Sequence, residues 1–252
     1  IFTRAQGGGT YCGPDTCGAR QKLNSDGTCS TCDDYLRVSA NSRNCETITC
    51  SERNQVVESD WSSASYFFSI VALSDQSEIY LTSYKNDSLQ GDRVLRDIYS
   101  QLGVVSSIEE QTLKLKKEAI DLPRVLHCDL TNAPDIAQTI AVSCYGLGIG
   151  CKLTGLHTLK IKETDRLEAL YNELTKLGAN IKVTNNSLEL TAGINFVYNC
   201  SIPTYNDHRM AMAFAPLAIK VPLIIEDVEV VSKSYPTFWK DLEEINFKIN
   251  QI

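Results

Sequence analysis

Three short stretches of this sequence carry side chains that could bind an anion and move protons. Lys162, Glu163 and Arg166 form the first, in which a lysine and an arginine four residues apart would share one face of a helix beside a carboxylate. Arg209 lies at the start of a long apolar run, and Asp135 directly follows a proline. Guanidinium and ammonium groups suit phosphate and carboxylate ligands, and carboxyl groups serve as general acids and bases. These residue types indicate chemistry on a small anionic substrate.

Each of these residues also has a purely structural explanation. A Lys-Glu-x-x-Arg sequence is common on solvated helix surfaces, and Asp135 could simply cap a helix. Arg209 could be buried against Asp207 or another carboxylate. Lys233 precedes the last predicted helix, where a lysine usually faces solvent. The functional interpretation therefore depends on elements that bring these side chains together.

Three segments are expected to form buried helices. Each begins with Asp or Asn, whose side chains cap free N–H groups, and each continues with apolar residues on almost every side. The segments cover residues 60–73, 132–142 and 206–219. If a three-fold axis relates them, their N-termini point the same way, and their partial positive charges would form an anion-binding floor.

A repeat extends around these helices. Each is followed by a predicted strand, at 78–84, 151–156 and 221–228, and then by an amphipathic helix. An offset of 75 residues pairs both apolar positions and helix stops, as in Leu95/Leu170, Tyr99/Leu174, Leu102/Leu177, Gly103/Gly178, Leu113/Leu188 and Leu115/Leu190. We therefore predict an α/β globe over residues 59–252, built from three βαβαββ units.

Residues 1–58 have a different character. They hold six of the ten cysteines, and an offset of 33 residues relates the first part to a second copy that breaks off near residue 59. The spacing resembles the Cys-rich repeats of extracellular proteins, which favours disulfides. A zinc site and an irregular leader remain alternatives; the zinc ligands would be Cys12, Cys17, Cys29 and Cys32. A count of free thiols with and without reductant would distinguish an oxidised segment from a reduced one.

Composition limits the classes of partner. The net charge of −7 disfavours a general nucleic-acid or anionic-membrane binder, and no apolar run approaches the ~20 residues of a membrane helix. The chain starts with Ile1 rather than Met, so we expect a fragment or a processed chain, and no targeting claim can depend on this end.

Taken together, five strings resemble 5-enolpyruvylshikimate-3-phosphate (EPSP) synthase in order and approximate spacing. They are DWSSASYF at 60–67, PDIA at 134–137, IKETDRL at 161–167, TYNDHRMAMA at 204–213 and KSYPTFW at 233–239. That family has two globes of three βαβαββ units with the active site between them, and this chain resembles the C-terminal globe. The resemblance covers neither the family's first globe nor the N-terminal strand that completes the second globe. It therefore implies that this chain is inactive alone. We expect a fusion or a mis-joined gene model.

The resemblance implies a role for each candidate residue. Arg166, Arg209 and Lys233 would hold phosphoenolpyruvate. Asp135 would meet the attacking hydroxyl of shikimate-3-phosphate, and Glu163 would be the other acid/base group. Lys162 would also contact shikimate-3-phosphate, while a threonine replaces the family's usual asparagine at position 158.

The implied reaction is an addition followed by elimination of phosphate, in the cytoplasm, with no metal or organic cofactor. The alternative is a non-enzymatic extracellular Cys-rich protein that carries a degenerate globe.

Overall fold

The structure, a computed structural model, describes residues 21–23, 29–31, 36–38, 45–47 and 57–251, and the chain divides into two units, Ile1–Gln55 and Val56–Ile252. In the first unit, two antiparallel strand pairs are described: β1 (Gln21–Leu23) with β2 (Cys29–Thr31), and β3 (Leu36–Val38) with β4 (Cys45–Thr47). The disulfide and zinc interpretations of residues 12–50 concern side chains outside the described ones.

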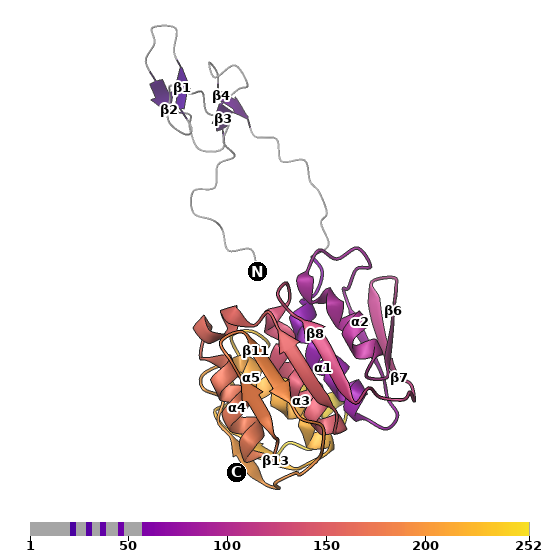
Figure 1. The fold of residues 1–252 in the computed structure, drawn as a ribbon. Coiled ribbons are helices and arrows are strands. Elements are labelled where there is room, and N and C mark those ends of the chain that lie inside the picture. Colours follow the sequence, from indigo (N-terminus) through magenta and orange to yellow (C-terminus); the bar gives the residue numbers. More distant parts are fainter. Residues whose placement is uncertain (1–20, 24–28, 32–35, 39–44, 48–56, 252) are drawn as a thin grey trace. The chain divides into compact units, whose positions relative to one another are not determined.

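The three predicted buried helices lie at the centre of the second unit (Figure 1). They are α1 (Trp61–Leu73), α3 (Ala137–Leu147) and α5 (His208–Phe214), which continues as the 3-10 helix η4 (Ala215–Ile219). The helix α1 contacts α3 and η4, and α3 contacts α5. Gly146 of α3 permits this packing, because a Cβ there would come within 2.5 Å of Leu73 Cδ2 and 2.9 Å of Leu217 Cδ1.

The caps of these helices differ in part from the prediction. Asp60 caps α1 by accepting hydrogen bonds from the N–H groups of Ser62 and Ser63, as expected. The third helix is capped by Asp207 rather than Asn206, and α3 begins five residues after Asn132 with no side-chain cap. Its first turn is instead the 3-10 helix η2 (Pro134–Ile136), because the ring of Pro134 presets the backbone for a helix start.

Two sheets cover the helices, and three antiparallel strands of each are arranged alike. The first has the order β5-β7-β6, with all neighbours antiparallel, and the second has the order β8-β9-β11-β10, in which β8 and β9 are parallel. Their strands are β5 (Glu78–Thr82), β6 (Val104–Glu109), β7 (Thr112–Lys117), β8 (Val125–Asp129), β9 (Gly150–Thr154), β10 (Ile181–Val183) and β11 (Ser187–Leu190).

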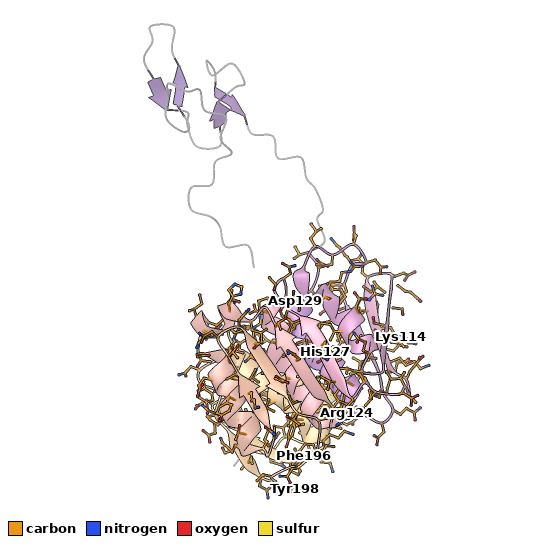
Figure 2. The ribbon with its side chains drawn as sticks, viewed as in Figure 1. Lys114, Arg124, His127, Asp129, Phe196 and Tyr198 are labelled. Carbon is orange, nitrogen blue, oxygen red and sulfur yellow. The ribbon has the colours of Figure 1, made fainter. Side chains whose placement is uncertain are left out.

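Alternation fixes which face of each strand meets the helices. Leu113 and Leu115 of β7 are fully buried, whereas Lys114 between them lies on the outer face (Figure 2). Leu126 of β8 is buried and its neighbour His127 is exposed.

The 75-residue offset is confirmed between the first two copies. The outer helices are α2 (Leu95–Ser100), which follows the 3-10 helix η1 (Gly91–Val94), and α4 (Arg166–Lys176). After each helix the chain turns at a glycine with positive φ, +79° at Gly103 and +101° at Gly178. The strand pairs β6–β7 and β10–β11 then follow in equivalent positions.

Within residues 57–251, the full βαβαββ order appears only in the middle copy. The first copy begins with α1, and the third consists of the parallel pair β12 (Cys200–Ile202) and β13 (Leu223–Ile225) with α5 and the outer helix α6 (Phe238–Glu244). In this part of the chain β13 pairs with β12 alone, and its residues are half-buried. Asn246, with φ +73°, follows α6 as the two glycines follow α2 and α4.

Candidate active site

The candidate residues lie where three helices start. Asp135 is in η2 at the entrance to α3, Arg166 is the first residue of α4, and Arg209 is the second residue of α5. The local sequence sets each start, since Asp165 accepts a hydrogen bond from Glu168 N (3.2 Å) and Asp207 accepts one from Arg209 N (2.9 Å). Side chains distant in sequence therefore meet at one end of the globe.

Arg166 is the centre of the cluster. Its side chain is only 2% exposed and bonds to three carboxylates: Nε to Asp207 Oδ2 (2.6 Å), Nη1 to Asp135 Oδ1 (2.9 Å) and Nη2 to Glu163 Oε2 (2.7 Å). Nη2 also donates to Asp207 Oδ1 at 3.3 Å. These four hydrogen bonds use all but one of the five N–H groups of a guanidinium, the remaining one being on Nη1.

Asp135 receives two further cations. Lys162 Nζ lies 3.1 Å from its Oδ1, and Arg209 Nη2 lies 3.4 Å from its Oδ2. Burial raises the pKa of Asp135, but the charges of Arg209, Lys162 and Arg166 outweigh it and leave the pKa below its usual range. Asp135 is therefore ionised at neutral pH and can accept a proton.

Arg209 connects different copies of the repeat. Its guanidinium, 14% exposed as a side chain, contacts Asp135 of the second copy and Ser62 Oγ of the first, the latter at 3.4 Å from Nη2. The sequence left open a pairing of Arg209 with Asp207. In the structure the Asp207 carboxylate accepts hydrogen bonds from the Arg166 side chain. Arg209 donates to this carboxylate only through its backbone N–H.

His208 lies against the acidic side of the cluster. Its Nδ1 is 3.7 Å from Glu163 Oε1 and 3.7 Å from Asp207 Oδ1, without a hydrogen bond. Burial and, after it, the charge of Arg209 lower the pKa of His208, so the imidazole is neutral at pH 7. These three residues offer ligand atoms within 4.8 Å of one another, but Arg166 already occupies both carboxylates.

Five of the six predicted site residues thus meet, and the sixth stands apart. Lys233 is exposed, two residues after the 3-10 helix η5 (Val228–Val231), and makes no hydrogen bond or ion pair with any residue that the structure describes. Three further cluster members were not among the predicted site residues: Ser62, Asp92 and Asp207. A lone acid such as Asp92, outside any motif, offers no signal in the sequence.

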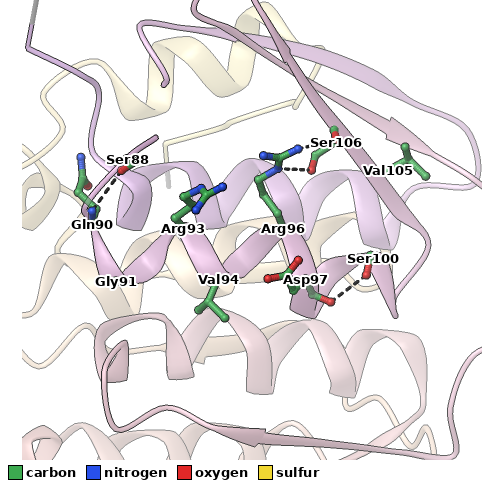
Figure 3. A pocket seen from close by; sticks show the side chains of 10 residues that line it. All are labelled: Ser88, Gln90, Gly91, Arg93, Val94, Arg96, Asp97, Ser100, Val105 and Ser106. Carbon is green, nitrogen blue, oxygen red and sulfur yellow. Dashed lines mark hydrogen bonds between the residues drawn. The ribbon is translucent and has the colours of Figure 1, made fainter. Parts of the chain in front are cut away.

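A groove of about 560 Å³ lies elsewhere, over η1, α2 and β6 (Figure 3). It contains none of the six predicted site residues. Arg96 crosses it and donates from Nε to Ser106 Oγ (3.0 Å) and from Nη2 to the carbonyl of Ser106 (3.2 Å). That contact covers part of the free edge of β6.

Across the described residues, every helix is too short or too polar to cross a membrane.

Comparison with known proteins identifies the family. The protein-family model described as EPSP synthase (3-phosphoshikimate 1-carboxyvinyltransferase) matches residues 38–242. This match begins before residue 59, where the sequence motifs placed the start of the globe. A 3-phosphoshikimate 1-carboxyvinyltransferase of Bacteroides fragilis is 46% identical over 196 residues, covering 77% of this chain and 48% of the relative. The corresponding protein of Haemophilus influenzae is 31% identical over 200 residues, covering 79% and 45%.

Solved structures agree at the level of the fold. EPSP synthase from Acinetobacter baumannii matches with a TM-score of 0.57 at 21% identity, over 75% of this chain and 46% of that one. The enolpyruvyl transferase NikO from Streptomyces tendae matches with a TM-score of 0.57 at 13% identity. The chain spans about half the length of the curated relatives it matches. This mixed α/β chain therefore belongs to the EPSP synthase family.

Proposed function

We propose that this chain carries the C-terminal half of an enolpyruvyl transferase site, which transfers enolpyruvyl from phosphoenolpyruvate to shikimate-3-phosphate. The observation that supports it best is the bridge from Arg166 to both Asp135 and Glu163, at 2.9 and 2.7 Å. Two carboxyl groups held on either side of a cation can act as a base and an acid on an anionic substrate bound beside that cation. A cytoplasmic setting follows as part of the same proposal.

The proposed steps balance with these two carboxyl groups. The 5-hydroxyl oxygen of shikimate-3-phosphate bonds to the central carbon of phosphoenolpyruvate, and its proton passes to Asp135. Glu163, after taking up a proton from solvent, delivers it to the methylene carbon, which becomes a methyl group. The bond to phosphate then breaks, and the proton on Asp135 passes to the departing phosphate. The methyl group returns a proton to Glu163 as the double bond re-forms. Asp135 suits the first role, since its lowered pKa keeps it ionised.

The remaining residues would bind the substrates. Arg166, Arg209 and Lys233 would hold the phosphate and carboxylate of phosphoenolpyruvate, and Lys162 and Asp135 would hold shikimate-3-phosphate. Within the described cluster, three cationic side chains, Lys162, Arg166 and Arg209, face four acidic ones, Asp135, Glu163, Asp207 and Asp92. Such a cluster would bind a free anion weakly, and further cations from outside it would strengthen binding.

Assayed alone, the 252-residue chain is expected to form no measurable enolpyruvylshikimate phosphate. Catalysis requires tighter binding of the transition state than of the substrates, within a cleft that surrounds them. The chain spans 48% of its Bacteroides fragilis relative, so it would supply one wall of that cleft. The measurement is phosphate release from phosphoenolpyruvate with and without shikimate-3-phosphate. Robust release that depends on shikimate-3-phosphate would contradict this expectation.

The anion site itself is testable without turnover. Titration of the full chain with inorganic phosphate or phosphoenolpyruvate, followed by NMR, should shift amides near Lys162 and Arg209 with a dissociation constant of millimolar order. Arg209→Ala should weaken binding about tenfold, ~1.4 kcal/mol, because Arg209 combines its charge with the start of α5. Added salt should weaken it further.

Lys240→Ala is the matched control for this titration. It removes a cation that pairs with Glu244 on the outer helix α6, and it should leave the affinity unchanged. Equal affinity in Arg209→Ala and the original chain would remove the basis for the proposed phosphoenolpyruvate site.

A further inference from the structure

Ser62 and Asp92 form a connection between the first copy of the repeat and Arg209. Ser62 is the second residue of α1 and is buried, and its hydroxyl donates a hydrogen bond to Asp92 Oδ2. Arg209 Nη2 lies 3.4 Å from the same Ser62 Oγ. Since the Ser62 proton points to Asp92, an oxygen lone pair is left for the guanidinium. The three side chains therefore form a directed hydrogen-bond chain.

The segment that carries Asp92 is held firmly against α1. Gln90 accepts a hydrogen bond from Trp61 N (2.9 Å) and donates one to the carbonyl of Ser59 (3.0 Å). Gly91, which is labelled next to Gln90 in Figure 3, packs closely against the loop before η2. A Cβ at Gly91 would lie only 2.3 Å from the carbonyl oxygen of Asn132. The position of Asp92 is thus set by contacts of its neighbours with the start of α1 and with the loop before η2.

Arg209 has few other anchors among the residues that the structure describes. Its remaining hydrogen bonds go to Asp135, from Nη2 to Oδ2 and from Nη1 to the backbone carbonyl, both at 3.4 Å. Without the Ser62 contact, the guanidinium would be held from the second copy alone. A long side chain held at one edge samples more orientations, which costs affinity for any ligand that needs one orientation.

We propose that Asp92 and Ser62 are positioning residues, which orient the Arg209 guanidinium for an anion through the hydrogen-bond chain Asp92–Ser62–Arg209. The role deepens the proposed function and rests on it, because its consequence is the affinity of the Arg209 site. Asp92 acts as the acceptor that fixes the Ser62 hydroxyl, and Ser62 acts as the acceptor that fixes Arg209. Neither side chain needs to contact the ligand.

Two pairs of variants of the full chain test this chain of contacts. Ser62→Ala and Asp92→Ala break it and should weaken inorganic phosphate binding about three- to tenfold. Ser62→Thr keeps a hydroxyl and Asp92→Asn keeps an acceptor, so both should stay within twofold of the original chain. Ser63→Ala is the control, because it removes the hydroxyl of a half-buried neighbour whose side chain, in the described part of the chain, bonds only to Asp60. Circular dichroism and thermal unfolding establish that each variant is folded.

A second measurement reports on Arg209 without any ligand. The side-chain Nε–Hε signal of Arg209 in ¹⁵N NMR, assigned by its loss in Arg209→Ala, should shift and narrow in Ser62→Ala and Asp92→Ala as the guanidinium gains freedom. It should stay in place in Ser62→Thr and Asp92→Asn.

The outcomes separate this proposal from the proposed function. If the original chain binds no phosphate while the Arg209 signal responds as expected, the positioning role stands and the anion site fails. If Ser62→Ala leaves both the affinity and the Arg209 signal unchanged, the positioning role is wrong. If Asp92→Asn and Asp92→Ala both tighten binding, Asp92 acts as a repelling charge, and the proposal is equally overturned.

Discussion

Replacing Arg166 by methionine is expected to lower the free energy of unfolding by about 3–5 kcal/mol, the usual cost of removing one partner of a buried ion pair. The Asp207 carboxylate is fully buried, and its contact with Arg166 Nε, at 2.6 Å, is its only ion pair with a Lys or Arg side chain in the described part of the chain. Methionine fills a similar volume but supplies no donor, so Asp207 would stay buried and unpaired. Urea unfolding followed by tryptophan fluorescence measures the change.

A control and a second-site change make this expectation specific. Lys240→Met removes an exposed partner of Glu244 and should change stability by less than about 0.5 kcal/mol. Adding Asp207→Asn to Arg166→Met should recover part of the loss, because the amide removes the unpaired charge while keeping an acceptor for Arg209 N. A loss below about 1 kcal/mol in Arg166→Met would mean that Asp207 is not held as the structure describes.

Gly178→Ala is expected to cost about 2–4 kcal/mol, from backbone strain together with overpacking. Gly178 has φ +101°, outside the region that an alanine adopts readily, and a Cβ there would lie 2.0 Å from the backbone oxygen of Asn195. Neither backbone can move freely, because Val197 N donates to the carbonyl of Leu177. Chemical denaturation reports the loss.

Gly193→Ala separates strain from contact in the same protein. Gly193 also has a positive φ, +140°, but nothing lies within 4 Å of its ideal Cβ. Its substitution should therefore cost only the backbone term, about 1–2 kcal/mol. If the two variants are equally stable, the close approach of Asn195 to the end of α4 has no energetic weight.

Local pattern was enough to predict the helices and their repetition. The segments 60–73 and 206–219 carry apolar residues on all sides, and such helices are removed from water only when they are buried on every side. Both segments are buried helices in the structure. The stops at Gly103 and Gly178 were equally readable, since a positive φ after a helix favours glycine. The pattern failed at Asn132, because the ring of Pro134 presets a 3-10 start two residues later and no side chain caps α3.

The sequence by itself determined which residues could do chemistry, because their types and spacing are properties of the chain. It also placed Asp135, Arg166 and Arg209 at helix starts, since the signals that begin a helix come from near neighbours in the chain. Only the tertiary structure decided how those side chains pair. Arg166 meets Asp207 across 41 positions, Arg209 meets Asp135 across 74, and Arg209 meets Ser62 across 147. Contacts at such separations depend on how three copies of the repeat pack around one centre, and no local pattern specifies that geometry.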